Sequence, residues 1–307
     1  MFDFIIAHGD EDGVCAAAIL ERYSPGARIL ISGPRELLRV LSSIRENSSI
    51  AIVDVAIPFN FVPLQKLANK YDVYYIDHHP LPISLRETEL GFRKISRDLA
   101  TCASEIAYRE FGEESSSPLA IYGAIGDYLD DTPLIKKLIE AQDRRTIYYE
   151  AAIIGYALSE KHEPGFSSRL AHLLADKVRP GYVRGLEELA SVGLRHEYEI
   201  MDFVKSHGRS FKSMAYVENP PIIGYAGKAA FYVMSYFGKS VGVCLNKKEE
   251  YADIVLRSDG TVDVGSFARS VAAEFNCDGG GHERAASLSV PLHSVEKVLE
   301  ALNKLSD

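Results

Sequence analysis

The sequence has no long apolar run and few cysteines. No apolar stretch approaches the roughly 20 residues that a membrane helix needs. The apolar run at residues 2–7 is too short for a signal peptide and follows no basic residue, so we expect neither a membrane span nor a secretory leader. The four cysteines are scattered, without a C-x-x-C pair. This argues against structural zinc and favours a reducing, cytoplasmic location.

Positive charge is also scarce. The 34 Lys and Arg are outnumbered by 43 Asp and Glu, which gives a net charge of −9. A protein that coats long nucleic acid usually carries a basic face, and the bulk charge gives no support for that class. A local basic groove or bound metal ions can still reverse the sign at a site. With 307 residues, of which 47% are hydrophobic, the chain can form one large soluble domain or two with proper cores.

The first 80 residues alternate between short apolar segments and single amphipathic segments. We predict strands at residues 2–7, 27–32, 50–56 and 73–77, and helices at residues 14–23, 34–44 and 61–70. Apolar strands separated by single helices are typical of a parallel sheet with helices on both faces. The predicted fold class is therefore α/β, with an N-terminal doubly wound parallel sheet domain.

The pattern changes twice in the rest of the chain. It is helical from Thr101 to about Lys205, and its last, polar helix is interpreted as a connector that leads to a hinge at residues 206–210. Strand-like segments follow at residues 213–219, 239–248, 251–260 and 261–265, then a helix at 266–275, a loop at 276–284, a strand at 285–290 and a final helix at 294–305. We predict an N-terminal domain at residues 1–190, whose helical part is 134–190, a helical connector at 191–212, and a smaller C-terminal α/β domain at 213–307.

Acidic residues and histidines gather where the predicted strands end. HGDEDG (8–13) follows the first strand, Asp54 ends the third, Asp77-His78-His79 ends the fourth, and GAIGDYLDD (123–131) lies in a helical context. Ligands of open parallel sheets bind outside the carboxyl ends of the strands. One edge of the sheet would then hold His8, Asp10, Asp12, Asp54, His78 and Asp127.

So many carboxylates in one place would repel one another and take up protons unless a cation joined them. Mixed Asp and His ligands suit manganese, zinc or iron better than calcium, and a pair of ions could activate a water. Each part also has a plain structural alternative. Residues 10–13 could be a capped turn, Asp54 a loop cap, residues 77–80 a strand-ending turn, and Asp130 and Asp131 capping residues. The coincidence of three clusters at strand ends favours the metal site.

A glycine run lies near the end of the chain. Gly279, Gly280 and Gly281 could turn their backbone N–H groups toward an anion, with His282 beside them. Arg257 and Arg284 are candidates for further phosphate contacts. The plain alternative is a flexible turn after the helix at residues 266–275.

Taken in order, HGDEDG, Asp54, IDHHP, GAIGDYLDD and GGGHERAAS resemble the motifs of the DHH phosphoesterase family. The resemblance is to the variety with a DHH-associated C-terminal domain, which includes RecJ-type nucleases, nanoRNases and related cyclic-dinucleotide phosphodiesterases. It covers nearly the whole chain. It implies two α/β domains and two divalent ions on the N-terminal side, usually Mn²⁺, with Mg²⁺ as the alternative.

The resemblance also implies roles for single residues. Asp10 and Asp12 would each hold a different ion, Asp54 would bridge both, and His78 and Asp127 would complete the second site. Several relatives begin the first motif with a ligand His in the pattern His-x-x-x-Asp-x-Asp. Here His8 precedes Asp10 by two positions only, which sets His8 apart from the aspartates.

The remaining roles concern the substrate. The resemblance implies that His79 faces the scissile phosphate and that Asp77 orients the histidines. His282 would bind a substrate phosphate together with the backbone of Gly279, Gly280 and Gly281, and Arg257 is similar to the phosphate-binding arginine of the family.

The function that these features imply is a metal-dependent phosphodiesterase, a RecJ-like exonuclease acting on single-stranded DNA or RNA or on short oligonucleotides from an end. The acidic balance keeps a nanoRNase or a cyclic- or linear-dinucleotide phosphodiesterase as the alternative. An inorganic pyrophosphatase or exopolyphosphatase is opposed by the GGGH element. A non-catalytic binding module, attached for example to a DNA replication or repair protein, is opposed by the complete set of aspartates. Polarity and the choice of DNA or RNA stay open.

Overall fold

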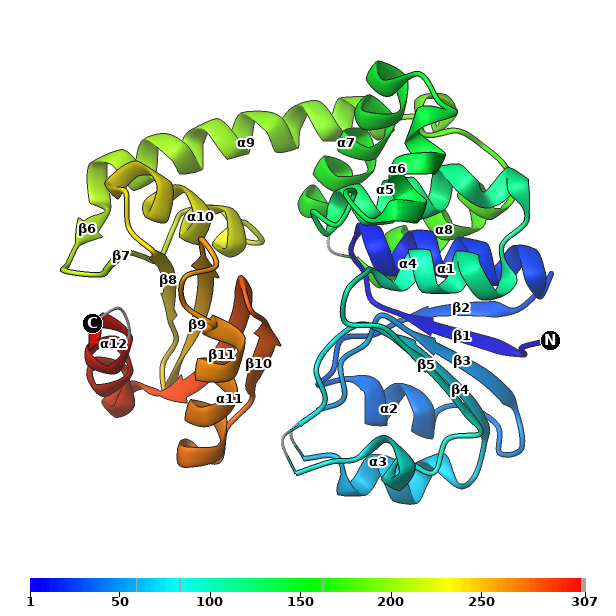
Figure 1. The fold of residues 1–307 in the computed structure, drawn as a ribbon, viewed down its shortest axis with the longest axis horizontal. Helices are drawn as coiled ribbons and strands as arrows, with labels where there is room; N and C mark the ends of the chain where they lie inside the picture. The colour runs from blue at the N-terminus through cyan, green and yellow to red at the C-terminus, as the bar shows by residue number, and fades with distance from the viewer. Residues whose placement is uncertain (59, 83, 162, 305–307) are drawn as a thin grey trace. The chain divides into compact units, whose positions relative to one another are not determined.

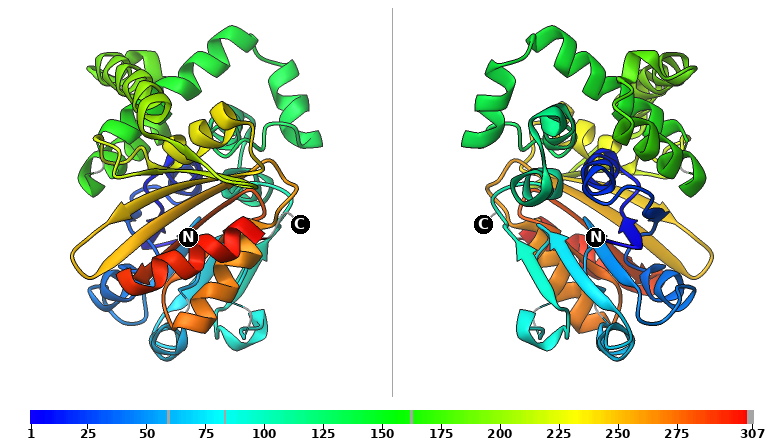
Figure 2. Two further views of the ribbon diagram at one scale, coloured as in Figure 1. Left: turned by 90° about the vertical axis from the view of Figure 1, so that its left-hand side faces the viewer. Right: turned by 90° about the vertical axis from the view of Figure 1, so that its right-hand side faces the viewer.

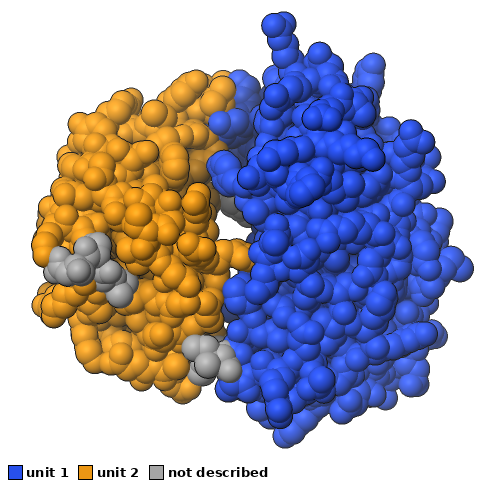
Figure 3. Space-filling model, in the orientation of Figure 1, with its two compact units in different colours: residues 1–193 blue, residues 194–307 orange. Residues whose placement is uncertain are grey.

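The computed structural model describes residues 1–58, 60–82, 84–161 and 163–304. The chain divides into two compact units, residues 1–193 and residues 194–307 (Figure 3). The division falls within one continuous helix, α9 (Leu186–His207), which overlaps the segment expected to be a connector. No helix among the described residues is long and apolar enough to cross a membrane.

The first unit is built on a five-stranded parallel sheet with the order β2-β1-β3-β4-β5. The strands are β1 (Phe4–Ala7), β2 (Arg28–Ile31), β3 (Ser49–Val53), β4 (Asp72–Asp77) and β5 (Lys94–Arg97). The first four are the predicted strands. The edge strand β5 was not predicted, because it is short and only one of its four residues is buried.

Helices cover both faces of this sheet (Figure 1). One face packs against α1 (Glu11–Tyr23), α4 (Ala103–Phe111) and α8 (Pro164–Ala175). Helices α5 (Ser117–Gly126) and α7 (Arg144–Glu160) pack on this layer, with α6 (Pro133–Glu140) beside α5 and α7. The other face packs against α2 (Leu37–Ser42) and α3 (Val62–Ala68). Short 3₁₀ helices are η1 (Glu87–Glu89), η2 (Glu114–Ser116) and η3 (Pro180–Tyr182). The predicted doubly wound α/β class is confirmed.

Neighbouring residues of the strands alternate between the two cores, as the two-residue period of a strand requires. Ile5 and Val53 belong to the core under α1, whereas Ile6, Ile52 and Tyr75 belong to the core under α2 and α3. The alternation therefore fixes which face each strand residue occupies, including the last residue of each strand.

The second unit contains a six-stranded mixed sheet with the order β10-β11-β9-β8-β7-β6. Its strands are β6 (Arg209–Ser210), β7 (Met214–Glu218), β8 (Val241–Lys247), β9 (Tyr251–Ser258), β10 (Gly279–His282) and β11 (Ala285–Pro291). Only β7 and β8 pair in parallel among the described strands of this sheet. Helices α11 (Val264–Phe275) and α12 (Val295–Lys304), with η4 (Leu292–Ser294), cover one face, and α10 (Ala226–Phe237) covers the other (Figure 2).

Some boundaries differ from the predictions for local reasons. Helix α1 begins at Glu11 and not at residue 14, because the Asp10 side chain caps it. Residues 261–265 were predicted to be a strand, which is wrong: Asp263 accepts a 2.8 Å hydrogen bond from the Ser266 N–H and starts α11. The predicted loop at 276–284 contains β10, so the GGGH run is a strand and not a turn.

Candidate metal centre

The predicted strand-end clusters lie side by side, because β1, β3 and β4 are neighbours in the sheet. His8 follows β1 directly, and its N–H points to the Val53 carbonyl at 3.4 Å. Asp54 follows β3, and its N–H donates to the Ile76 carbonyl at 3.0 Å. Asp77 is the last residue of β4. One edge of the sheet therefore holds the side chains that the sequence placed at three separate strand ends.

Asp54 lies at the middle of this edge in an unusual conformation. Its φ is 58°, in the left-handed region, which Asp tolerates better than most side chains. It is 2% exposed, and its Oδ2 accepts no hydrogen bond from the described residues. Burial, and then the charges of Asp10 and Asp12, raise the pKa of Asp54 well above its usual value. Burial and the neighbouring carboxylates therefore outweigh the nearby imidazoles at Asp54.

Asp10 combines a structural contact with a place in the site. Its Oδ1 accepts from the Gly13 N–H at 3.1 Å, which makes Asp10 the N-cap of α1, and its Oδ2 lies 2.7 Å from His8 Nδ1. Loss of hydration among the surrounding groups would raise the pKa of Asp10, whose side chain is 48% exposed, but the His8 imidazole outweighs this and lowers that pKa. The Asp10 charge in turn raises the pKa of His8. Asp10 therefore caps α1, as the structural alternative predicted, and its ligand atom still lies within 4.8 Å of that of Asp54.

Asp12 is fully buried and is held by a helix that the sequence did not link to the site. Its Oδ2 accepts from the Ala103 N–H at 2.6 Å and its Oδ1 from the Ser104 N–H at 2.8 Å. These two N–H groups are the first of α4, where a helix presents unpaired donors and the positive end of its dipole. The signal for this contact in the sequence was the pair of small residues, Ala103 and Ser104, at the start of a helix that follows β5.

His78 joins Asp54 to Asp127. Its Nε2 lies 3.4 Å from Asp54 Oδ1 and 3.1 Å from Asp127 Oδ2. Asp127 follows the last residue of α5 and is 24% exposed. Burial, and then the charges of Asp12 and Asp10, raise the pKa of Asp127, whereas burial and the neighbouring His79 lower the pKa of His78. Two acids that resist ionisation thus face one neutral imidazole.

Asp77 and His79 form a separate pair at the same edge. Asp77 Oδ1 lies 2.8 Å from His79 Nδ1, and its Oδ2 accepts from the Tyr75 hydroxyl at 2.5 Å. Burial would raise the pKa of Asp77, but the charge and hydrogen bond of His79 lower it to about 2. Burial would lower the pKa of His79, and Asp77 raises it. Arg97 adds a hydrogen bond to the His79 carbonyl. Sequence patterns assigned no role to Tyr75 or Arg97.

Within the described residues of the first unit, three groups of side chains bring their ligand atoms within 4.8 Å of one another. These groups are His8 with Asp10 and Asp54, Asp12 with Asp54 and His78, and Asp54 with Asp77 and His79. Asp54 belongs to all three. In the third group Asp77 Oδ2 accepts from the Tyr75 hydroxyl and Oδ1 lies 2.8 Å from His79 Nδ1, so Asp77 also anchors the His79 ring.

The donor set fits divalent cations. Buried Asp54 Oδ2 has no hydrogen-bond donor among the described residues, and burial together with neighbouring carboxylates raises the pKa values of Asp54 and Asp127. Carboxylate oxygens and imidazole nitrogens suit Mn²⁺, Fe²⁺ or Zn²⁺, and a carboxylate-rich set also suits Mg²⁺. The first two groups share Asp54, which is the arrangement that a bridging carboxylate requires.

The predicted phosphate-binding residues gather in the second unit. His282 pairs with Ala285, and Ala285 pairs with Arg257, so all three are neighbours across β10, β11 and β9. A side chain at Gly227, at the start of α10, would come within 2.7 Å of Arg257 Nη2, which shows how closely the guanidinium packs there. Arg269, which the sequence did not single out, donates to the Gly281 carbonyl at 2.8 Å.

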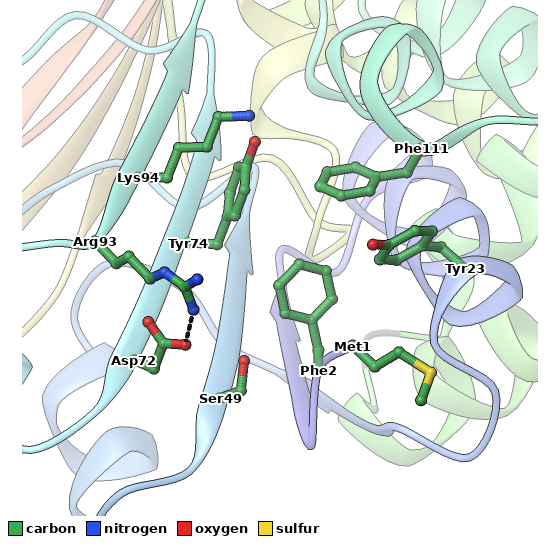
Figure 4. A pocket seen from close by; sticks show the side chains of 9 residues that line it. All are labelled: Met1, Phe2, Tyr23, Ser49, Asp72, Tyr74, Arg93, Lys94 and Phe111. Carbon is green, nitrogen blue, oxygen red and sulfur yellow. Dashed lines mark hydrogen bonds and ion pairs between the residues drawn. The ribbon is translucent and has the colours of Figure 1, made fainter.

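A cavity of about 450 Å³ lies at the opposite edge of the first sheet (Figure 4). It is lined by Met1, Phe2, Tyr23, Ser49, Asp72, Tyr74, Arg93, Lys94 and Phe111. Its two cations are already paired, Arg93 with Asp72 and Lys94 with Glu110. Its rings pack on one another, with Phe2 and Phe111 centroids 5.7 Å apart. The residues that line this cavity offer no set of metal ligands and no surplus charge, so the carboxyl edge of the sheet is the stronger candidate site.

Comparisons with known proteins agree with this fold. Residues 223–306 match the DHHA1 domain. No curated protein matches the sequence. Similar solved structures include the DHH domain of a protein described as a member of a family of ribosomal proteins. It is 17% identical, with a TM-score of 0.69 over 98% of this chain and 86% of the other.

Two further solved structures carry more specific descriptions. The pGpG-specific phosphodiesterase PggH from Vibrio cholerae is 12% identical, with a TM-score of 0.59 and coverage of 97% of each chain. RecJ from Thermus thermophilus, solved with Mn²⁺, is 16% identical, with a TM-score of 0.66 over 97% of this chain and 51% of RecJ. The same RecJ has been solved with Mg²⁺. At these identities the likeness shows a shared fold, and this chain spans about half of that RecJ.

Proposed function

We propose that this chain, a DHH-family protein by its fold and its C-terminal DHHA1 domain, is a metal-dependent phosphodiesterase that hydrolyses single-stranded or short nucleic acid from an end. The observation that carries the proposal is the position of Asp54. This buried carboxylate belongs both to the group with His8 and Asp10 and to the group with Asp12 and His78. A shared carboxylate between two ligand groups is what a two-ion phosphodiesterase site needs.

Two divalent ions, Mn²⁺ or Mg²⁺, would supply an activated water and would stabilise the charge that develops on the phosphate. Asp10, with His8 beside it, would hold one ion and Asp12 with His78 the other, while Asp54 would serve both. Asp127, whose Oδ2 lies 3.1 Å from His78 Nε2, would complete the second set. The N–H groups of Ala103 and Ser104 keep the Asp12 carboxylate in one orientation.

His79 would act on the substrate. Asp77 lies 2.8 Å from its Nδ1 and fixes the ring, and Nε2 would be the nitrogen that contacts a substrate phosphate. The raised pKa of His79 favours the protonated ring, which can donate a hydrogen bond or a proton to a phosphate oxygen. In the second unit, the backbone of Gly279, Gly280 and Gly281, with His282 and Arg257, would bind a neighbouring phosphate.

Two classes of substrate are supported by different observations. A RecJ-like exonuclease on longer single strands is supported by the fold shared with RecJ. Hydrolysis of dinucleotides or of very short RNA is supported by the net charge of −9, which disfavours a long polyanion, and by the fold shared with PggH. The GGGH element, which lies within the DHHA1 match, argues against an inorganic pyrophosphatase or exopolyphosphatase. A cytoplasmic location and a DNA replication or repair partner stay predictions.

A substrate panel tests the proposal. The protein is incubated with Mn²⁺ and end-labelled single-stranded DNA, the matching RNA, a linear dinucleotide, or pyrophosphate. We expect mononucleotides from at least one nucleic acid substrate and no phosphate from pyrophosphate. Labels at the two ends reveal polarity, and the ratio of rates on strand and dinucleotide decides between the two substrate classes. Hydrolysis of pyrophosphate alone would overturn the proposal.

A further inference from the structure

The hydroxyl of Tyr75 connects two strand ends of the candidate metal centre. Tyr75 is fully buried on β4, and its ring packs against Phe92 with centroids 5.5 Å apart. The hydroxyl lies 2.5 Å from Asp77 Oδ2 and 3.0 Å from the carbonyl oxygen of Val55. Val55 follows Asp54, so one phenol group touches both the residue after the shared carboxylate and the acid that holds His79.

The Tyr75 hydroxyl has two acceptors beside it but only one proton to donate. A phenol hydroxyl has one proton, and both neighbours are acceptors, so the proton goes to the stronger one, the buried Asp77 carboxylate. Asp77 then has both oxygens engaged, Oδ2 by Tyr75 and Oδ1 by His79 Nδ1 at 2.8 Å. A buried carboxylate that loses one of two donors rotates to find another or takes up a proton, and either change loosens its hold on the imidazole.

We propose that Tyr75 is a positioning residue, which fixes the Asp77 carboxylate and through it the orientation of the His79 ring toward the substrate phosphate. This inference rests on the proposed function, because it assigns His79 to the substrate. It adds a residue that acts on His79 through Asp77. The residue could be anticipated from spacing, since Tyr75 and Asp77 are two apart on one strand and share a face.

The neighbouring tyrosine offers a matched control. Tyr74 lies on the same strand with its ring on the other face, among Phe2 and Phe111, and its hydroxyl donates to Glu110 instead of Asp77. Tyr75→Phe and Tyr74→Phe remove the same atom from adjacent positions, and Phe fills nearly the same volume in each. A purely structural role of the Tyr75 hydroxyl would lower stability without a specific effect on turnover.

The first experiment is a double-mutant cycle on the best substrate of the panel. We expect Tyr75→Phe to lower kcat by roughly 10- to 100-fold, the usual cost of losing a group that orients a site residue, with KM changed little. Tyr74→Phe should keep the kcat of the unmodified protein. In a His79→Ala background, Tyr75→Phe should lower kcat no further, because its effect passes through His79. Unchanged kcat in Tyr75→Phe, or additive losses in the double variant, would overturn the proposal.

A second experiment does not depend on activity. NMR of the ¹⁵N-labelled, Mg²⁺-loaded protein would detect the His79 Nδ1–H proton as a downfield imidazole resonance, identified by its loss in His79→Ala. We expect Tyr75→Phe to shift or broaden this resonance and Tyr74→Phe to leave it in place. If the panel shows no turnover, the proposed function fails while this readout still decides the role of Tyr75. An unmoved resonance in Tyr75→Phe would refute the positioning role.

Discussion

Asp54 combines a strained backbone conformation with a buried carboxylate, and both are unfavourable for stability. A non-glycine residue in the left-handed region costs on the order of 1–3 kcal/mol, and such strain gathers at functional sites. Asp54 adds burial and nearby like charges to a φ of 58°. None of these features stabilises the protein without a cation. The conformation aims one carboxylate at His8, His78 and His79 at once, with separations of 3.4 to 3.9 Å.

We predict that Asp54→Asn abolishes turnover and lowers Mn²⁺ affinity by more than about 100-fold, since loss of a direct ligand exceeds the 10- to 100-fold cost of losing its supports. The metal-free variant should melt at a higher temperature than the unmodified protein near neutral pH, because Asn keeps the shape and removes an unfavourable charge. Calorimetric titration and thermal melts measure both. Asp130→Asn is the control, since Asp130 contacts Tyr148. Normal turnover in Asp54→Asn would contradict the metal site.

At the residue scale, the sequence could locate the acids and histidines because they end apolar runs. It could not supply their hydrogen-bond partners. The donors to Asp12 are backbone N–H groups of residues 103 and 104, which are 91 and 92 positions away, and a backbone group leaves no mark in the residue type. Arg97 meets His79 only because β5 pairs with β4 in a given register, Asp77 against Arg97.

At the scale of elements, the junction of β1 and α1 decides where Asp10 and Asp12 lie. A methyl group at Gly13 would come within 2.5 Å of the His8 carbonyl oxygen, which is backbone and cannot move aside. The helix can therefore begin this close to the strand only with glycine at its third position. The end of β1, the N-cap and Gly13 therefore bring Asp10 and Asp12, which lie in one turn, next to the ends of the neighbouring strands.

We predict that Gly13→Ala pushes α1 away from β1, costs roughly 1–3 kcal/mol of stability, and weakens Mn²⁺ binding by at least about tenfold. The control is Gly165→Ala near the start of α8, where the nearest atom is the end of the Arg169 side chain at 3.4 Å. That change should be neutral or slightly stabilising. Urea unfolding and calorimetric titration provide the comparison. Equal behaviour of the two variants would show that the close approach at Gly13 does not position the site.

The elements that the sequence predicted well are those whose burial is continuous. The strands β1, β3 and β4 are apolar over most of their length, and their ends were placed within a few residues. Strand β5 and helix α10 were not identified, and residues 261–265 were assigned to a strand because Val and Thr favour strands. The structure shows that one capping side chain, Asp263, overrides that preference and starts a helix at Val264.

At the scale of the whole molecule, several carboxylates are clustered at one edge of a sheet in a protein whose net charge is already −9. Asp54 and Asp127 have raised pKa values, so between the ordinary carboxylate pKa of about 4 and their raised values the folded protein binds more protons than the unfolded chain. Stability of the metal-free protein therefore falls as pH rises through that window, by about 1.4 kcal/mol per pH unit for each proton. Asp77, with a pKa of about 2, acts in the opposite sense, and its contribution is lost only as pH falls from about 4 toward 2.

We predict that Mn²⁺ raises the melting temperature more at about pH 8 than at about pH 5.5, because cations replace the protons that the site releases. Melts with Mn²⁺ and with a chelator across this range measure the difference. Repulsion from the overall negative charge would also lower stability at high pH, so the slope needs a control. In metal-free Asp54→Asn the fall in stability with pH should be shallower than in the unmodified protein. An identical slope in both proteins would assign the effect to the net charge or to His8 and His79, whose pKa values are also raised, and would remove the thermodynamic argument for a cation at Asp54.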